Sequence, residues 1–539
     1  MPLSKTRPLG YAAIVLHAHL PFVRHPEKRE CLEELWLMEA ITETYIPLLL
    51  MMEELLAKGI DFRLTMSITP TLAAMLNDAL LQKRYSKHLV KLLDLGEKEA
   101  ERTKNQPRLQ RVVHMYQNRL QKVQSFFHAH NGQLLNVFRQ IADTGKLEIL
   151  ASAATHGYLP LLYANPKAVE AQIAIGITAY KKYFSEHPKG FWLPECGFTS
   201  GIDEILAKYG VKYFIADSHG LLHGNPPPPD LVYAPIYTPH GVAVFGRDWE
   251  SSKQVWSATE GYPGDFDYRD FYRDIGFDLD RDYIGPYLVD DIRGFTGMKY
   301  HKITGSSGHK AIYDPVQAGK KAIEHAGNFM FNRELQIKHL AANMERPPLI
   351  VAPYDAELFG HWWYEGPEWL KSLFTKSCRD QNIFTMVTLG EYIDKYPIGQ
   401  VSAPADSSWG MGGYHEVWLD HSNAWIYRHL HAAAERMGEL ANRYPHAVGV
   451  KKRALDQAAR ELLLAQSSDW AFIMKTGTMV EYAVHRTKTH LLNFTTLYEG
   501  VLAGHIDEDR LRVLEGFHNV FPDLDYSIYA FDDPAQGAG

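Results

Sequence analysis

Three kinds of feature are scarce in this 539-residue sequence, and each absence excludes a class of protein. Its three cysteines, Cys31, Cys196 and Cys378, are too few and too far apart for a disulfide framework or a CxxC metal site. We find no apolar run of 18 residues and no basic stretch leading into an apolar core, so neither a membrane span nor a signal peptide is expected. The net charge of −8 argues against nucleic acid or an anionic membrane as partner. We therefore expect a cytoplasmic enzyme.

Aromatic residues, in contrast, are plentiful. The chain has 11 Trp, 30 Tyr and 24 Phe, and several stand in loop-like stretches such as GHWWYEGPEW. Most of them must fill the core of a chain this long. Clusters beside Gly, Asp and His are less easily assigned to a core. Such clusters favour a protein that stacks aromatic rings on the apolar faces of sugars.

Seven short apolar runs stop abruptly at polar residues. Runs of this length, bounded by turn formers, are typical of buried parallel strands. Polar groups at the carboxyl ends of such strands are where a β/α barrel builds its active site. The series therefore predicts a catalytic barrel. In chain order, the runs end at His17 and His19, Ser67 and Thr69, His156, Glu195, Asp217 and His219, Arg247 and Asp248, and Asp355 and Glu357.

The chain is too long for one ordinary core, so more than one domain is expected. We predict a catalytic barrel over residues 1–400, interrupted at about 75–145 by a charged helical insertion that is too long for a crossover helix. The turn-rich segment VSAPADSSWGMGG marks a boundary. Helical periodicity then predicts a C-terminal helical domain over 401–526. Residues 527–539 are predicted to be a flexible tail.

Two strand ends carry the best candidates for catalytic carboxylates. Glu195 follows the buried FWLP run, and Gly197 would allow a sharp turn that presents it. Asp355 ends another strand just before a dense aromatic group, and Glu357 is a weaker rival on the same face. Two carboxylates on different strands are the minimum equipment for glycosidic chemistry. The alternative is that both merely cap helices.

His17 and His19 share one face of a strand, a spacing also used by metal ligands. His156, Asp217 and His219 could complete such a site at other strand ends. The rival chemistry is therefore metal-assisted hydrolysis or deacetylation. A metal site would make both histidines essential and activity sensitive to chelators, whereas glycosyl transfer would make them sugar-binding groups.

Five stretches resemble, in order, the sequence motifs of glycoside hydrolase family 57. They are HAHLPFVRHP, ASAATHGYLPLL, FWLPECGF, APYDAELFGHWWYEGP and SSWGMGGYHEVWLD. The similarity covers roughly residues 8–525. Connecting stretches, including LLAQSSDWAFIMKTGTMVEYA, look like the α-1,4-glucan branching enzymes of that family.

The resemblance implies an incomplete (β/α)7 TIM-like barrel with a helical insertion and a C-terminal α-helical domain that helps to form the cleft. By motif match, Glu195 would be the nucleophile and Asp355 the general acid/base of a retaining double displacement. No metal or organic cofactor is implied. The residues implied to bind substrate are His17, His19, Trp36, His156, Arg247, Trp409, Trp418 and Asp469.

The expected reaction cleaves an α-1,4 bond of a linear α-1,4-glucan and joins the cut segment to a 6-hydroxyl. Two alternatives in the same family, a 4-alpha-glucanotransferase and an α-amylase-type hydrolase, use the same catalytic pair. From other classes, a metal-dependent barrel hydrolase or deacetylase and a non-catalytic glucan-binding protein remain open. Branching enzymes of the family carry a tyrosine at the tip of a mobile loop. Tyr233, Tyr237 and Tyr262 are candidates for it, and the loop could be shortened.

Overall fold

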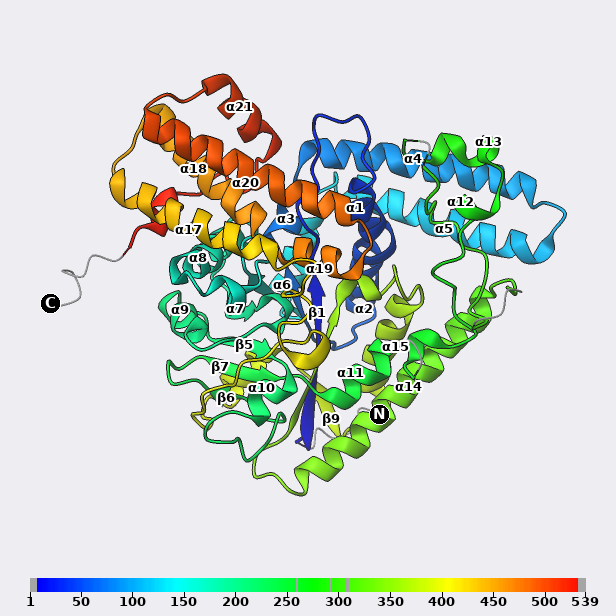
Figure 1. The fold of residues 1–539 in the computed structure, drawn as a ribbon. Helices are drawn as coiled ribbons and strands as arrows, with labels where there is room; N and C mark the ends of the chain where they lie inside the picture. Colours follow the sequence, from blue (N-terminus) through cyan, green and yellow to red (C-terminus); the bar gives the residue numbers. More distant parts are fainter. Residues whose placement is uncertain (1–6, 258–259, 291, 306–309, 532–539) are drawn as a thin grey trace.

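The protein is represented by a computed structural model, which describes residues 7–257, 260–290, 292–305 and 310–531 (Figure 1). The strands are β1 (Gly10–Ala18), β2 (Leu64–Ile68), β3 (Leu147–Ser152), β4 (Gly190–Trp192), β5 (Tyr213–Ala216), β6 (Ile236–Tyr237), β7 (Ala243–Gly246), β8 (Leu349–Asp355) and β9 (Phe384–Met386). The helices up to the end of the barrel are α1 (Glu34–Ala40), α2 (Ile46–Ala57), α3 (Pro70–Leu76), α4 (Ala79–Arg102), α5 (Pro107–Ala129), α6 (Leu134–Asp143), α7 (Leu159–Leu162), α8 (Pro166–Phe184), α9 (Ile202–Lys208), α10 (Ser218–Leu222), α11 (Trp249–Trp256), α12 (Ile275–Asp278), α13 (Arg281–Ile284), α14 (Pro315–Ala341), α15 (Gly366–Arg379) and α16 (Leu389–Lys395).

The strands form one sheet that curls into an incomplete barrel. Its order is β6-β7-β5-β4-β3-β2-β1-β8, with β9 on β1, and only the β6–β7 pair is antiparallel. Between β7 and β8, Asp248 N donates to Val351 O (2.8 Å), but no ladder forms there within the described ranges. The seven parallel strands from β7 to β8 in this order thus wrap around an axis with a gap on one side, and β9 is an eighth parallel strand beside β1. The predicted (β/α)7 class is confirmed.

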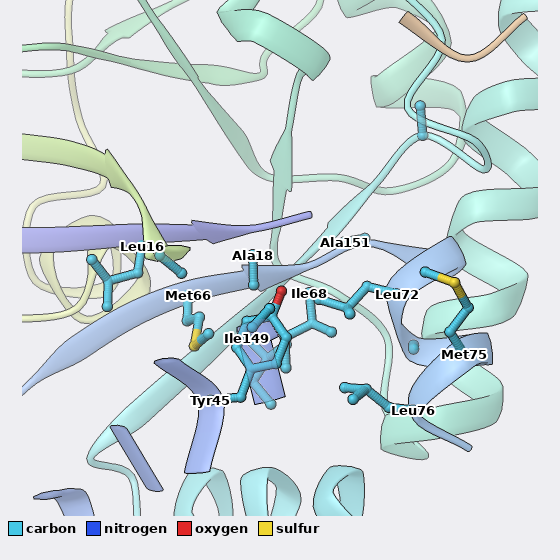
Figure 2. Close-up of a cluster of buried hydrophobic side chains, with 14 of the residues drawn as sticks. Leu16, Ala18, Tyr45, Met66, Ile68, Leu72, Met75, Leu76, Ile149 and Ala151 are labelled. Carbon is cyan, nitrogen blue, oxygen red and sulfur yellow. The ribbon is translucent and has the colours of Figure 1, made fainter. Parts of the chain in front are cut away.

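The period-two alternation of the strands divides the core into two parts. In β1, Tyr11, Ala13 and Val15 pack inside the barrel with residues such as Trp192 and Phe245. Their neighbours Leu16 and Ala18 face outward onto the helices, where Figure 2 shows them beside residues of β2, β3 and α3. Because the interior floor is filled with apolar side chains, the next inward residue on each strand lies at the top of the barrel.

The helical segment between β2 and β3 contains α3, α4, α5 and α6. Helices α4 and α5, of 24 and 23 residues, lie side by side and extend to one side of the barrel in Figure 1. Apolar residues recur along α4 at helical spacing (Leu81, Tyr85, Leu89, Leu92), and these are its buried face. Amphipathicity therefore explains why this charged segment packs as a helical pair.

Helices α17 (Trp425–Arg443), α18 (Gly449–Ala465), α19 (Ser468–Thr476), α20 (Val480–Ala503) and α21 (Glu508–Phe517) form a bundle over one edge of the barrel (Figure 1). Buried Glu461 ties three of them together, since its carboxylate lies 2.7 Å from His490 Nδ1 and 2.6 Å from His518 Nδ1. The helical C-terminal part is thus confirmed. The boundary at 400/401 stays a prediction.

The end of the chain is packed further than the predicted 527–539 tail allows. Residues Tyr526–Tyr529 form a 3-10 helix, and Tyr529 is fully buried. The anchoring is apolar burial, which a sequence window ending in small and polar residues does not reveal. The remainder of that predicted tail, residues 532–539, lies outside the described residues.

One helical stretch, Glu34–Ala57, is long and apolar enough to cross a membrane by composition, and 78% of its apolar window is buried inside the protein. It joins α1 to α2 through a π-helical turn, Ile41–Tyr45. Within this stretch, the Glu43 carboxylate pairs with His361 Nδ1 (2.7 Å).

Candidate active site

The barrel mouth collects the polar residues predicted from the strand ends. His17 and Asp355 face each other across the β1–β8 pair, where they are register partners, and His17 is also paired in register with Ser67 of β2. Asp217 and Arg247 occupy the corresponding positions beyond β5 and β7. Strand alternation alone brings these side chains to one place.

Glu195 reaches the mouth through an unusual turn after β4. Its φ is 60°, and that of Cys196 is 50°, so both residues adopt the left-handed conformation that side chains other than glycine rarely take. The expectation that Gly197 makes the sharp turn is wrong, since its φ of −73° is ordinary. Gly197 is needed for space instead, because an added Cβ would lie 2.6 Å from the Tyr158 ring. Backbone strain of this kind is concentrated at functional sites.

The carboxylate of Glu195 is held by Trp409, which follows the barrel in sequence. Trp409 Nε1 donates to Glu195 Oε2 (2.8 Å), and Trp409 N donates to Glu195 O (3.0 Å). The other oxygen, Oε1, lies 3.8 Å from His156 Nδ1. These contacts leave Glu195 oriented by a hydrogen-bond donor that favours its ionised form.

Three histidines stack beside Glu195. The rings of His19 and His156 lie 3.8 Å apart, and His17 Nε2 is 3.0 Å from His156 Nε2. Each ring is anchored by a second group. The anchors are Ser67 for His17 (2.6 Å), Thr69 and Asp469 for His19 (2.9 and 3.0 Å), and Ser468 for His156 (2.9 Å).

Burial sets the charge of these groups. It lowers the pKa of His17 and His156 well below the usual value, and the neighbouring histidines lower it further. Both rings are therefore neutral at pH 7. Asp469 behaves oppositely, because the charge of His19 and the hydrogen bond to it outweigh burial and lower the pKa of Asp469 to about 2. The site thus offers neutral imidazoles and one fixed carboxylate to polar substrate groups.

The two predicted catalytic carboxyl groups hold their protons to unusually high pH. Burial, and then the charge of Glu357, raise the pKa of Asp355 to about 8. Burial raises the pKa of Glu195 to about 7, with a further contribution from Asp355, while the Trp409 hydrogen bond acts in the opposite direction. Asp355 thus holds its proton to higher pH than Glu195 does. This difference suits a protonated Asp355 as the general acid and an ionised Glu195 as the nucleophile.

Arg247 forms the far wall of this site. Its guanidinium donates to Asp217 Oδ2 (3.1 Å) and lies 5.7 Å from the Trp409 ring centre. Asp217 also lies 3.2 Å from His219 Nδ1. Asp217 and His219 are therefore engaged with Arg247 and each other, and no described contact joins them to the histidine cluster. The five-residue metal site considered from sequence is not assembled.

A smaller candidate metal group remains. Ligand atoms of His19, His156 and Asp469 lie within 4.8 Å of one another. The same three residues also hydrogen-bond within the protein, His19 to Thr69, His156 to Ser468 and Asp469 to Ser467. The donor set fits a zinc ion by type, so sensitivity of the activity to chelators distinguishes metal-assisted chemistry from glycosyl transfer.

One predicted substrate-binding tryptophan, Trp418, lies differently from expectation, and the role of Trp36 stays a prediction. Trp418 is 1% exposed and stacks on Tyr158 (4.3 Å, 17°), so it lies behind the site and presents no open face to a sugar. That part of the prediction is corrected, because a motif match does not specify depth. Trp36 is partly buried and packs edge-on to Tyr482 (6.0 Å, 90°).

None of the three candidate loop tyrosines lies over the carboxylates in the described contacts. Tyr237 is a strand residue, Tyr233 O accepts from Leu349 N, and Tyr262 hydrogen-bonds to Asn328 (2.7 Å). Helix α10 and the residues that follow it are tied to residues 403–405 by backbone hydrogen bonds at Gly220 and Asn225. This stretch is fixed to the body of the protein.

Sequence reasoning missed several residues of the site. Tyr45 donates to Glu357, whose Oε1 also accepts from His19 N (3.3 Å). Ser468 and the ring of Trp192, stacked under His17 (4.5 Å), complete the histidine cluster. The alternation of β8 pointed to Glu357, but no local pattern marked Tyr45, which reaches the mouth from a helical turn.

Comparison with known proteins finds relatives along almost the whole chain. Residues 13–291 match the family model for glycosyl hydrolase family 57, and residues 429–529 match one for the C-terminal part of 1,4-alpha-glucan branching enzymes. A 1,4-alpha-glucan branching enzyme of Thermococcus kodakarensis is 33% identical over 98% of this chain and 79% of its own length.

Two solved structures are similar along almost the whole chain. One is an alpha-amylase, AmyC, from Thermotoga maritima, which is 46% identical with a TM-score of 0.91 and covers 97% of this chain and 99% of its own. The other is a branching enzyme of family 57 from Pyrococcus horikoshii, 33% identical with a TM-score of 0.88 over 98% of both chains.

Proposed function

The chain belongs to glycosyl hydrolase family 57, and we propose that it is a 1,4-alpha-glucan branching enzyme, which transfers part of a linear α-1,4-glucan to a 6-hydroxyl. The observation that carries the proposal is the pairing of two buried carboxyl groups with different proton affinities, Glu195 held by Trp409 and Asp355 beside Glu357. Such a pair is what glycosidic bond exchange requires. A non-catalytic glucan-binding protein would have no need of it.

In the first half of the reaction, the Glu195 carboxylate attacks the anomeric carbon, while Asp355 gives its proton to the departing 4-oxygen. The product is a glycosyl ester on Glu195 and a free 4-hydroxyl. In the second half, Asp355 takes the proton of an incoming 6-hydroxyl, whose oxygen displaces Glu195 from the anomeric carbon. Two inversions retain the configuration, and both carboxyl groups return to their starting states.

The neighbouring residues are proposed to bind the donor sugar. Neutral His17 and His156, together with His19 and Asp469, offer hydrogen-bond partners to its hydroxyls from one side of Glu195. Trp409 and Arg247 line the opposite side of Glu195. Hydrogen bonds that strengthen as the anomeric carbon becomes cationic lower the barrier as well as binding the substrate.

A second candidate, hydrolysis of the α-1,4 bond, is favoured by two observations. The 46% identical relative is named an alpha-amylase, and none of the three candidate loop tyrosines contacts the two carboxylates in the described contacts. Water at about 55 M competes with any acceptor for the glycosyl ester, so transfer needs a positioned acceptor and a site closed to solvent.

Product analysis on amylose separates the two candidates. Reducing ends are counted after incubation with the protein, and again after a debranching enzyme is added. A branching enzyme releases few new ends before debranching and many after it. Abundant ends before debranching, with no further increase, would establish hydrolysis and reject the branching proposal. Chain elongation without α-1,6 linkages would instead indicate a 4-alpha-glucanotransferase.

We further propose that the enzyme works in the cytoplasm on a glucan, with neither nucleic acid nor membrane as partner. The net charge of −8 supports this, since polyanions would be repelled.

A further inference from the structure

Trp362 lies on the turn that follows the two carboxylates of β8. Its backbone N donates to Glu357 O (3.2 Å), so it is anchored to the segment that carries Asp355. Half of its side chain (50%) is nevertheless exposed, whereas its neighbours Trp363 and Trp369 are fully buried. A large ring kept at the surface on the turn that follows Asp355 and Glu357 is a candidate for ligand contact.

Phe271 fixes the orientation of this indole. The two rings are stacked, with their centres 4.2 Å apart and their planes at 27°. Lys299 Nζ lies 3.8 Å from the centre of the Phe271 ring. Lys299 and Trp362 therefore lie on opposite faces of the Phe271 ring. Trp362 is therefore packed on one face by Phe271, and no other described ring stacks on its second face.

The support beneath this pair is rigid. Lys299 is 1% exposed, and its ammonium also lies 4.3 Å from the Phe295 ring centre. Arg269, fully buried two residues before Phe271, donates to His361 O (2.9 Å) and pairs with Glu43 (3.5 Å). These contacts hold the loop that carries Phe271 against the turn that carries Trp362. A ligand would find the platform already formed, without a cost for ordering it.

Polar groups flank the platform. The ring of His361 meets both Phe271 (5.1 Å) and Trp362 (5.5 Å) edge-on, and its Nε2 lies 4.0 Å from the Glu39 carboxylate. The side chains of His361 and Glu39 are both partly exposed. An aromatic face beside an imidazole and a carboxylate suits a glucosyl unit, whose ring face is apolar and whose rim carries hydroxyls.

We propose that Trp362, stacked on Phe271, binds a glucosyl unit of the glucan outside the catalytic carboxylates and so favours long chains over short ones. The proposal rests on the proposed function for the identity of the ligand. A pair that served only to pack the loop would bury both rings, whereas Trp362 leaves half of its surface in solvent.

Binding to an inactive protein tests the platform. In a Glu195→Gln background, Kd is measured by calorimetry for amylose and for maltotriose, which serves as the short-chain ligand. Trp362→Ala should raise the Kd for amylose about three- to tenfold, the value of one aromatic contact, and that for maltotriose less than twofold. Trp362→Phe should restore most of the affinity. Phe331→Ala, an exposed aromatic of α14 (54%), is the matched control and should change neither Kd.

Two outcomes would overturn the proposal. One is an unchanged Kd for amylose in a Trp362→Ala protein that melts at the parent temperature. The other is an equal loss for both ligands accompanied by a lower melting temperature, which would assign the pair to packing. A different result would reject the proposed function without affecting the Trp362 platform. If the wild type forms no α-1,6 linkages while Trp362→Ala selectively weakens amylose binding, branching is rejected and the platform stands.

Discussion

The indole of Trp409 donates a hydrogen bond to the carboxylate of Glu195 (2.8 Å) although the two residues are 214 positions apart. The bond is reinforced by a second one between their backbones, from Trp409 N to Glu195 O (3.0 Å). A segment beyond the last barrel strand therefore positions the residue proposed to attack the sugar. It also stabilises the charged form of that residue, on which nucleophilic attack depends.

Removing this donor should shift the acid limb of the pH profile. In Trp409→Phe, the hydrogen bond that lowers the pKa of Glu195 is lost, so its pKa rises above about 7 and less of the enzyme has an ionised nucleophile at neutral pH. We expect kcat/KM at pH 7 to fall about 10- to 100-fold, and the acid limb to move to higher pH. Trp256→Phe, whose ring meets Trp409 only edge-on (6.3 Å), is the control. An unshifted acid limb would show that the bond orients Glu195 without stabilising its charge.

The alkaline limb should respond to Glu357. The charge of Glu357 raises the pKa of Asp355, so Glu357→Gln should lower that pKa below about 8, and Asp355 should lose its proton at lower pH. Activity that requires protonated Asp355 would then decline earlier as pH rises. The measurement is kcat/KM from pH 5 to 9.5. The acid and alkaline limbs of this profile report apparent pKa values that belong to the coupled Glu195–Asp355 pair. A limb that moves to higher pH would contradict the assigned proton donor.

Replacement of Trp418 should act on stability. The side chain is 1% exposed and stacked on Tyr158, so Trp418→Ala should cost about 3–5 kcal/mol of unfolding free energy. Trp249→Ala, on a ring that is 64% exposed, should cost less than about 0.5 kcal/mol. Denaturant titration followed by circular dichroism measures both. A Trp418→Ala protein of normal stability but altered glucan affinity would restore the role first predicted for it.

Chelation decides whether the histidine cluster needs a metal. The proposed mechanism uses His17, His19 and His156 only as hydrogen-bonding groups, so activity should survive dialysis against EDTA and should not increase when Zn²⁺ is added. Elemental analysis of the active protein should find less than about 0.1 zinc per chain. Loss of activity on chelation, restored by zinc, would reassign His19, His156 and Asp469 as ligands.

The barrel and most of its mouth follow from the sequence because strand alternation is local. Once Val15 faces the apolar floor, His17 must face the mouth, and the same rule places Asp217, Arg247 and Asp355. Residues that reach the barrel mouth from outside the strands follow no such local pattern. Asp469 was reached only through resemblance, and Tyr45 was missed, since a helical turn near the mouth looks like any buried helix.

The failures also have physical causes. Trp418 was placed in the cleft because it stands in a motif beside Trp409, but neighbours on an irregular loop can differ completely in depth. Gly197 was assigned the turn because glycine tolerates positive φ, yet Glu195 and Cys196 adopt it instead. A pattern of residue types predicts which backbone conformations are low in energy. It does not reveal where the fold imposes a strained one.

The most direct test of the account is the identity of the residue that carries the glycosyl group. Asp355→Asn should still react slowly with an α-glucosyl fluoride, which needs no acid to leave, and should then accumulate the ester for lack of a base. Mass spectrometry of the intact protein and its peptides should show added glucosyl mass on the peptide containing Glu195, and none in the Glu195→Gln/Asp355→Asn double variant. A label on Glu357, or turnover without any covalent adduct, would contradict the proposed roles of Glu195 and Asp355.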